Sequence, residues 1–144
     1  MATINFHDEY LQSSILRVAF LNPYRCTGNK IMTFYEDPSD LKIKVDANHP
    51  FTFRSTYIVL PESTQKGKIC TITITVPITP DREYRVVTNA KENTCTLKID
   101  IKQNDGTWVT APGITERKPK TPWLESQGFC VADERFKDFD NLKN

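Results

Sequence analysis

The sequence predicts an all-β fold, an antiparallel β-sandwich, with an open β-barrel as the alternative. Three observations point to this class. Short runs that alternate apolar and polar residues recur along the chain. Turn signals separate these runs about every 8–12 residues. Two of the runs each carry a cysteine near one end, Cys70 and Cys95.

Seven or eight short strands follow from these runs. The run 41–45 shows the pattern most clearly, because it places Leu41, Ile43 and Val45 on one face. Turns are expected at residues 22–24 and at 104–106, where Asn-Asp-Gly favours a tight hairpin. The expected strands cover residues 15–21, 31–35, 41–45, 51–60, 68–76, 83–88, 94–101 and 107–109. Those at 68–76, 83–88 and 94–101 are predicted to form an antiparallel meander.

A chain of 144 residues and 16.6 kDa fits a single domain. Residues 1–14 are polar and mixed and are interpreted as a flexible lead, and residues 15–110 as the β-sandwich domain. Residues 111–144 are expected to pack on the same domain as an extended proline-rich tail and a short helix. The basic run 117–120 is predicted to be exposed. Phe136, Phe139 and Leu142 stand at helical spacing, which indicates the C-terminal helix.

Charge and hydropathy exclude two classes of function. The formal net charge is +1, from 19 basic and 18 acidic residues, unlike the strongly basic surface of a nucleic-acid binder. No run approaches the length of about 20 apolar residues that a transmembrane helix needs. The first residues lack the basic start and apolar stretch of a signal peptide. If the cysteines form disulfides, we expect a mature form from which an export segment has been removed, with an initiator Met supplied.

The four cysteines lie far apart and form no Cys-x-x-Cys pair, which argues against a zinc ribbon or a thioredoxin-type site. Two disulfides formed in an oxidising compartment are the simplest interpretation. The alternative is four reduced thiols in a cytosolic protein. Of the three possible pairings, Cys70–Cys95 is favoured because both residues lie in similar strand contexts. Cys26–Cys130 then remains by default and would tie the tail to the first hairpin.

The middle of the chain contains the strand 50–57, Cys70 opening a strand, the turn and strand 79–86, and the closing run 94–97. In these features it resembles small exported lipoproteins of Gram-negative bacteria, a family without a known function. The resemblance covers roughly residues 15–101. The chain differs in having Asp-Arg at positions 81–82, where a glycine is common, and the proline-rich tail lies outside the match. The resemblance implies export, supports the Cys70–Cys95 bridge, allows a lipid anchor on the full-length precursor, and implies no activity.

Nothing in the sequence points to catalysis. His7 and His49, the only two histidines, are interpreted as solvated surface residues, because the sequence places no catalytic partner beside them. No Gly-x-Ser-x-Gly motif is present, and the five glycines are scattered. Asp37 and Asp40 lie in a turn, where aspartate is favoured for backbone hydrogen bonding alone. We therefore expect no enzyme, no catalytic residue, no cofactor and no metal site.

A binding role has more support. Trp108 and Trp123 flank the basic segment, and together with Arg117 and Lys118 they could form a recognition surface. The structural alternative is that Trp108 packs across the end of a sheet and Trp123 pins the tail to the domain. The preferred hypothesis is a periplasmic or secreted accessory module of the bacterial cell envelope that binds another protein. The other is a carbohydrate-binding or carbohydrate-degrading module that uses exposed tryptophans and turn carboxylates.

Overall fold

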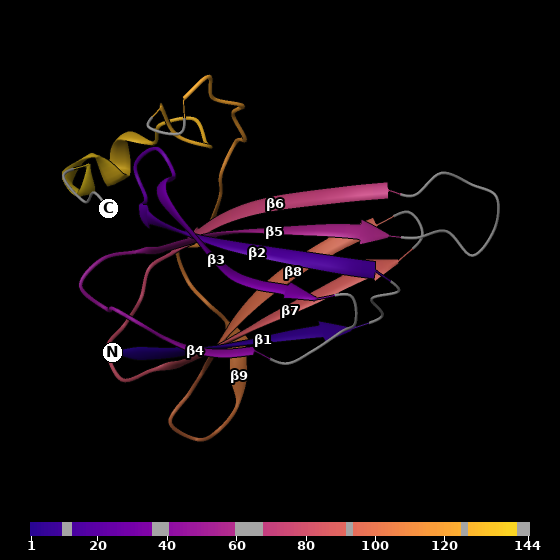
Figure 1. The fold of residues 1–144 in the computed structure, drawn as a ribbon. Helices are drawn as coiled ribbons and strands as arrows, with labels where there is room; N and C mark the ends of the chain where they lie inside the picture. The colour runs from indigo at the N-terminus through magenta and orange to yellow at the C-terminus, as the bar shows by residue number, and fades with distance from the viewer. Residues whose placement is uncertain (10–12, 36–40, 60–67, 92–93, 125–126, 141–144) are drawn as a thin grey trace.

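The protein is a sandwich of two five-stranded β-sheets (Figure 1). The structure, a computed structural model, describes residues 1–9, 13–35, 41–59, 68–91, 94–124 and 127–140. The all-β prediction and the choice of a sandwich over a barrel are confirmed. No helix among the described residues is long and apolar enough to span a bilayer.

Sheet A contains the N-terminal strand as an inner strand, the second of five. Its strand order is β4 (Leu41–Val45), β1 (Ala2–Glu9), β7 (Glu83–Lys91), β8 (Thr94–Lys102) and β9 (Trp108–Thr110). β1 runs parallel to β7, and the other neighbours in this sheet are antiparallel.

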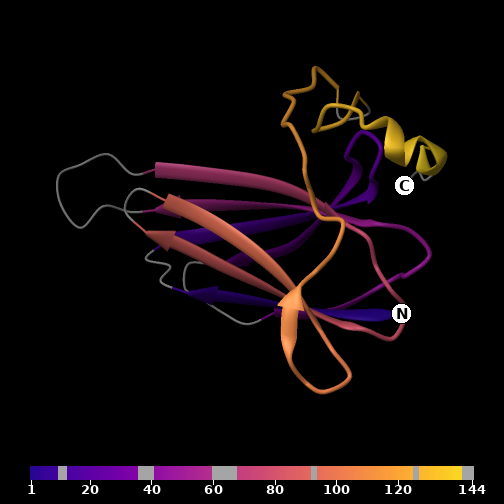
Figure 2. The ribbon, with the colours of Figure 1, turned by 180° about the vertical axis from the view of Figure 1, so that it is seen from behind.

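Sheet B is antiparallel throughout and carries the C-terminal segment on its outer side. Its order is β10 (Thr115–Glu116), β6 (Lys68–Val76), β5 (Phe51–Val59), β2 (Ser13–Asn22) and β3 (Thr27–Tyr35). After β10 the chain packs over one end of this sheet, beside the β2–β3 turn, and finishes in the 3₁₀ helix η2 (Glu134–Phe139), as both views show (Figures 1 and 2). The short C-terminal helix is therefore confirmed, whereas Leu142 lies outside the described residues.

The main core lies between the two sheets. Phe6 of β1 meets Phe53 of β5 edge to face, with ring centroids 5.3 Å apart. Burying each such side chain contributes about 1.5–3 kcal/mol. The guanidinium group of Arg17 is also inside the sandwich, over the Phe6 ring at 4.8 Å. The fully or nearly buried core residues are Ala2, Ile4, Phe6, Val45, Phe53, Ile74, Val76, Tyr84, Val86, Ile99, Ile101 and Ala111.

The prediction of a flexible lead over residues 1–14 is wrong where the structure describes it. Ala2, Ile4 and Phe6 are buried and alternate with Thr3, Asn5 and His7, which is the period of a strand. The polar residues of this segment lie on the outer face of sheet A, where they contact water. The polar composition therefore marks one face of a strand rather than a flexible segment.

The predicted three-stranded meander is also wrong. β7 and β8 form the expected antiparallel hairpin, but β6 belongs to the opposite sheet. The connection between β6 and β7 crosses the end of the sandwich, where the Tyr84 hydroxyl accepts a hydrogen bond from the Thr79 backbone N–H at 2.9 Å. Asp81, in the turn, has a φ of +61°, the left-handed conformation that favours glycine and that Asp tolerates.

The Cys26–Cys130 disulfide is present, as expected. Cys70 is also disulfide-bonded, but the side chain of Cys95 lies outside the described part of the chain, so the Cys70–Cys95 pairing stays a prediction. Cys70 belongs to sheet B and the backbone of Cys95 to sheet A, so that bond would join the two sheets. The aspartates at positions 37 and 40 lie outside the described residues.

Candidate binding site

The described residues 118–124 and 127–131 of the C-terminal segment form a narrow hairpin-like projection, here called the pin. Its two legs are held together by backbone hydrogen bonds. The Val131 N–H donates to the Lys118 carbonyl at 2.9 Å, and the Lys120 N–H donates to the Phe129 carbonyl at 3.0 Å. Pro119 and Cys130 form an isolated antiparallel bridge between these bonds.

The tip of the pin presents two large apolar side chains to water. Trp123 is 95% exposed and Leu124 is 65% exposed. The side-chain oxygen of Gln127 accepts a hydrogen bond from the Trp123 backbone N–H at 3.1 Å. The Gln127 N–H in turn donates to the Leu124 carbonyl at 2.9 Å. Hydrogen bonds therefore join the backbones of Trp123 and Leu124 to Gln127, while both apolar side chains remain exposed.

The base of the pin is bonded covalently to the turn between β2 and β3. The Cys26–Cys130 disulfide spans 104 residues of sequence. The Phe129 N–H donates to the Cys26 carbonyl at 3.1 Å, and the Cys130 N–H donates to the Arg25 carbonyl at 3.3 Å. Gly128, with a φ of +95°, lies so close to Arg25 that a Cβ atom there would overlap the Arg25 carbonyl oxygen. This position therefore requires glycine.

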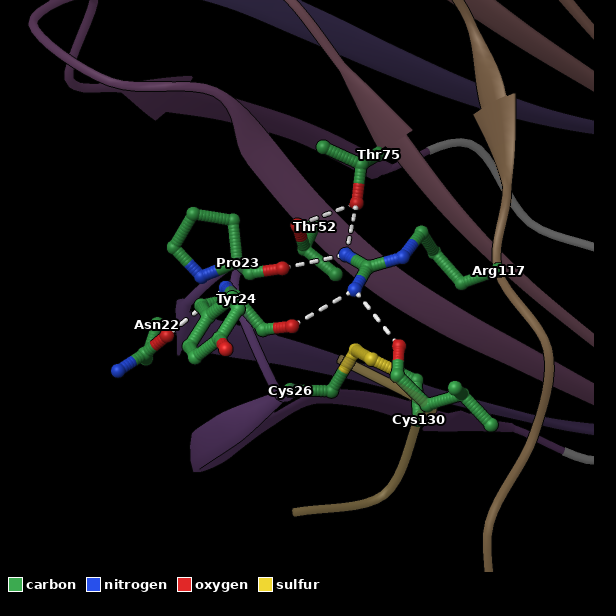
Figure 3. The surroundings of a disulfide bond; sticks show 9 residues. Asn22, Pro23, Tyr24, Cys26, Thr52, Thr75, Arg117 and Cys130 are labelled. Carbon is green, nitrogen blue, oxygen red and sulfur yellow. Dashed lines mark hydrogen bonds between the residues drawn. A yellow bond between two sulfur atoms is a disulfide. The ribbon is translucent and has the colours of Figure 1, made fainter. Parts of the chain in front are cut away.

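Arg117, directly before the pin, is buried and joins three separate segments (Figure 3). Its guanidinium donates to the carbonyl oxygens of Pro23 and Tyr24 in the β2–β3 turn and to that of Val131 in the pin. It also donates to the Thr75 hydroxyl of β6 at 3.0 Å. One side chain thus connects the β2–β3 turn, sheet B and the pin.

The charge of Arg117 is stabilised mainly by dipoles. Burial lowers the pKa of Arg117, and the negative charge of Asp133 partly opposes this shift. The guanidinium also lies over the Phe136 ring of η2 at 5.2 Å. The prediction that Arg117 belongs to an exposed recognition surface is therefore wrong. No local pattern in the sequence indicates that the carbonyl groups of Pro23 and Tyr24, more than ninety residues away, accept hydrogen bonds from Arg117. Lys118, the next residue, is exposed as expected.

A second apolar cluster lies under the pin, on the outer face of sheet B. The Phe129 ring stacks on the Phe20 ring with centroids 5.7 Å apart. The Arg54 guanidinium lies over both rings, at 5.6 Å from Phe20 and 5.1 Å from Phe129. Burial lowers the pKa of Arg54. Val18, Cys26 and Cys130 complete the cluster. The pin is therefore packed on the sheet as well as cross-linked to it.

The η2 helix and the residue that follows it also contact the β2–β3 turn. Asp140, after η2, accepts hydrogen bonds from the side chains of Asn22 at 3.2 Å and Arg25 at 3.1 Å. The Tyr24 hydroxyl donates to a Glu134 carboxylate oxygen at 3.0 Å, and this bond raises the pKa of Tyr24. These contacts hold the β2–β3 turn between the helix and the sheet.

The structure does not bring the two tryptophans together. Trp108 belongs to β9 at the edge of sheet A, on the opposite side of the molecule from the pin in both views (Figures 1 and 2). It is half-buried, with the Arg85 guanidinium over its ring at 4.5 Å and the Lys102 ammonium at 5.9 Å. The surface predicted from Trp108, Trp123, Arg117 and Lys118 therefore reduces to Trp123 and Lys118.

Two further features of the site were missed from the sequence. Leu124 and Gln127 complete the tip, and Gly128 permits the close approach at its base. The sequence signal that could have indicated the close approach is the short run Gly-Phe-Cys at 128–130, in which a glycine precedes an aromatic residue and a cysteine.

His7 is exposed on β1, and His49 lies 4.0 Å from the Asp46 carboxylate in an adjoining turn. Within the described ranges, no group of three His, Cys, Asp or Glu side chains is arranged to hold a metal ion. Comparison with protein-family models, curated proteins and solved structures found no match to this chain. The tip of the pin is thus the strongest candidate site that the geometry offers.

Proposed function

We propose that this protein is a non-enzymatic, exported binding module of the bacterial envelope that binds another protein through the tip of its pin. The observation that carries the proposal is the 95% exposure of Trp123 on a loop whose backbone is held by hydrogen bonds and whose base is cross-linked. Neighbouring exposed apolar side chains often mark an interaction site, and Trp123 and Leu124 are adjacent at the tip.

Physical chemistry favours such a tip as an anchor for a partner protein. Tryptophan is enriched among the residues that dominate interface energies, and burying its ring removes a large apolar area from water. Association also costs conformational entropy, which is smaller when the binding loop is already ordered. The disulfide at Cys130 and the Gln127 hydrogen bonds order the tip before any partner arrives.

Export is supported by the cysteine chemistry. A disulfide that closes a loop of 104 residues is typical of proteins that fold in oxidising compartments. The resemblance of residues 15–101 to small Gram-negative lipoproteins points to the periplasm or the cell surface. A lipid anchor on the precursor would then place the module at a membrane surface, with the pin available to a neighbouring protein.

The test compares Trp123→Ala with a matched control in affinity capture. The control is Val109→Ala, because Val109 is 39% exposed in β9, on the opposite side of the molecule. Immobilised wild-type protein and the Val109→Ala variant are expected to retain the same envelope protein, and Trp123→Ala to lose it with unchanged melting temperature. Retention of that protein by Trp123→Ala would contradict the proposal. Binding to a glycan panel that depends on Trp123 would favour the carbohydrate alternative.

A further inference from the structure

Arg54 of β5 differs from most other arginines of the chain in what surrounds its guanidinium group. A carboxylate or carbonyl oxygen accepts hydrogen bonds from the side chains of Arg25, Arg82, Arg85, Arg117 and Arg135. Within the described part of the chain, Arg54 makes no hydrogen bond and no ion pair. Its five N–H donors therefore have no oxygen acceptor from these residues.

The position of Arg54 makes this lack of an acceptor costly. The side chain is half-buried on the outer face of sheet B, with its guanidinium over the Phe20 and Phe129 rings. The rings attract the positive charge but replace only part of the water that the group has lost. Burial accordingly lowers the pKa of Arg54, because a less polar environment disfavours the charged form. A bound anion would reverse this effect.

Thr73 of β6 provides a second unused polar group beside Arg54. The two residues are paired in the register of β5 and β6, so their side chains share the outer face of the sheet. Thr73 is only 4% exposed, and its hydroxyl forms no hydrogen bond with another described residue. The neighbouring Thr75 hydroxyl, by contrast, bonds to Thr52 at 2.7 Å and accepts from Arg117 at 3.0 Å. A buried hydroxyl without a partner destabilises the fold, so a ligand that accepts its hydrogen would be favoured.

Thr56 adds a hydroxyl on the other side of Arg54 along the same strand. It lies two residues after Arg54 and therefore on the same face of β5. The Thr56 oxygen accepts a hydrogen bond from the Thr71 hydroxyl at 3.4 Å, which leaves the Thr56 O–H free to donate. Three side chains with available donors thus lie next to one another on this face.

The strands of sheet B supply no carboxylate to this group. β2, β3, β5 and β6 contain no aspartate or glutamate. Glu116 of β10 pairs with Ile74, whose side chain lies in the core between the sheets, so Glu116 belongs to the opposite face from Arg54. An anion at Arg54 would therefore meet no negative charge from these strands on the outer face.

We infer that Arg54, Thr73 and Thr56 form a binding site for a carboxylate group on the outer face of sheet B. The planar guanidinium offers parallel N–H donors that match the two oxygens of a carboxylate, and its single charge balances that of one carboxylate. The two hydroxyls donate to the same group. A free carboxylic acid anion and an acidic side chain of another protein present this same chemistry.

The carboxylate site adjoins the pin but does not depend on its tip. Phe129 belongs to the pin, and its ring contacts the Arg54 guanidinium at 5.1 Å. Trp123 and Leu124, which carry the proposed function, take no part in the site. The inference therefore goes beyond the proposed function and does not rest on it.

The test is a titration of the intact, oxidised protein with sodium acetate, followed by NMR at the Arg54 Nε–Hε group. Sodium chloride at equal ionic strength and pH is the reference. We expect a saturable shift with a dissociation constant in the millimolar range. Arg135 is the internal control, because the Asp133 carboxylate already accepts its hydrogen bonds. A linear change at Arg54 no larger than that at Arg135 would overturn the inference.

Two variants locate the bound carboxylate. Thr73→Val removes the hydroxyl but keeps the shape of the side chain, and Arg54→Lys keeps the charge but loses the paired donors. Each is expected to raise the dissociation constant for acetate at least about fivefold, measured at the backbone amides of residues 54, 56 and 73. Thr110→Val is the matched control, because Thr110 is exposed in β9 of sheet A. Equal effects of Thr73→Val and Thr110→Val would contradict the site.

Affinity capture with the Arg54→Lys variant separates the two sources of the carboxylate. Reduced retention of the envelope protein that wild type retains, together with its release by acetate, would mean that a partner side chain occupies the site. Unchanged retention with acetate binding at Arg54 would identify a free carboxylate as the ligand. Trp123→Ala tests the proposed function separately, so either proposal can fail alone. Absence of acetate binding at Arg54 would overturn the inference whichever protein is retained.

Discussion

The outer faces of the two sheets differ in the polarity of their side chains and in what covers them. On sheet A most of the outer side chains are polar, and several bind one another across strands. Asn5 donates to the Glu83 carboxylate at 2.7 Å, and Arg85 pairs with Asp100 at 3.2 Å. On sheet B, Val18 and Phe20 face outward and are buried beneath Phe129 of the pin. The outer face of sheet A is in contact with water, whereas the outer face of sheet B is covered by a segment of the same chain.

The difference lies in strand β2. Its residues Leu16, Val18 and Phe20 point to the outer face and are apolar, whereas the buried Arg17 lies on the inner side, over Phe6. A strand with an apolar outer face cannot be left in water at low cost, because each buried side chain of this size contributes about 1.5–3 kcal/mol. The pin, η2 and the disulfide provide the cover that this strand needs, and sheet A needs none.

The largest expected effect comes from the Cys26→Ser/Cys130→Ser double variant. The chain-entropy model assigns a loop of this length a stabilisation of about 4.7 kcal/mol, because the unfolded chain loses freedom when it is cross-linked. Urea unfolding monitored by circular dichroism measures the loss. A loss below about 1 kcal/mol would mean that the cover is held mainly by its non-covalent contacts.

The next effect is that of Arg117→Met. The variant leaves three carbonyl groups and the Thr75 hydroxyl without their donor, and we expect it to cost roughly 3 kcal/mol of unfolding free energy. Lys118→Met is the matched control, since Lys118 is exposed one position later, and its effect should stay within about 0.5 kcal/mol. Equal effects of the two variants would show that Arg117 does not join the cover to sheet B.

Asp100→Asn tests the polar face of sheet A. The Asp100 side chain is only 2% exposed and contacts Arg85 at 3.2 Å and Lys98 at 3.6 Å. Loss of its charge should cost about 1–2 kcal/mol, because Arg85 then loses a charged acceptor. Lys98→Gln serves as the control, since the Lys98 side chain is 65% exposed, and should cost less than about 0.5 kcal/mol. Chemical denaturation of both variants measures the difference.

The smallest effect concerns the start of η2. Hydrogen bonds from Arg135, at 2.6 Å from the side chain and 3.0 Å from the backbone N–H, lower the pKa of Asp133. A carboxyl group whose pKa is lowered by folding stabilises the folded state at pH values above its pKa in the unfolded chain, which is near 4. This contribution is lost as the pH falls through the pKa that the group has in the folded state. Arg135→Gln should move the pKa of Asp133 back toward its usual value. An NMR titration of the Asp133 carboxyl group measures the shift, and an unchanged pKa would contradict the assigned cause.

Local periodicity predicted individual strands well. The bounds 41–45 and 68–76 agree with β4 and β6, because alternation marks a strand wherever one face is buried. The β1 strand was missed since its outer residues are polar, and β10 was missed since two residues carry no pattern. Assignment of β6 to the wrong sheet has a similar origin, because alternation does not determine which neighbour a strand pairs with.

The candidate site depended on contacts that the sequence does not encode locally. Cys26 and Cys130 were predicted to pair only as the remainder after Cys70–Cys95, and the structure shows their disulfide. Trp123 was among the predicted binding residues. Burial of Arg117 could not be predicted, because its acceptors at Pro23 and Tyr24 come from a turn that only tertiary packing brings near. The half-burial of Trp108 likewise depends on Arg85 across the sheet.

The most direct test of the contrast between the two faces is hydrogen exchange, residue by residue, in the wild-type protein and in the Cys26→Ser/Cys130→Ser variant under native conditions. Loss of the disulfide should speed exchange in residues 22–27 and 117–140 and at the end of β2 that precedes the β2–β3 turn. The amides of β1, β7 and β8 should keep their protection, since sheet A does not depend on the cover. Equal loss of protection in both sheets, or no change in residues 117–140, would contradict the account.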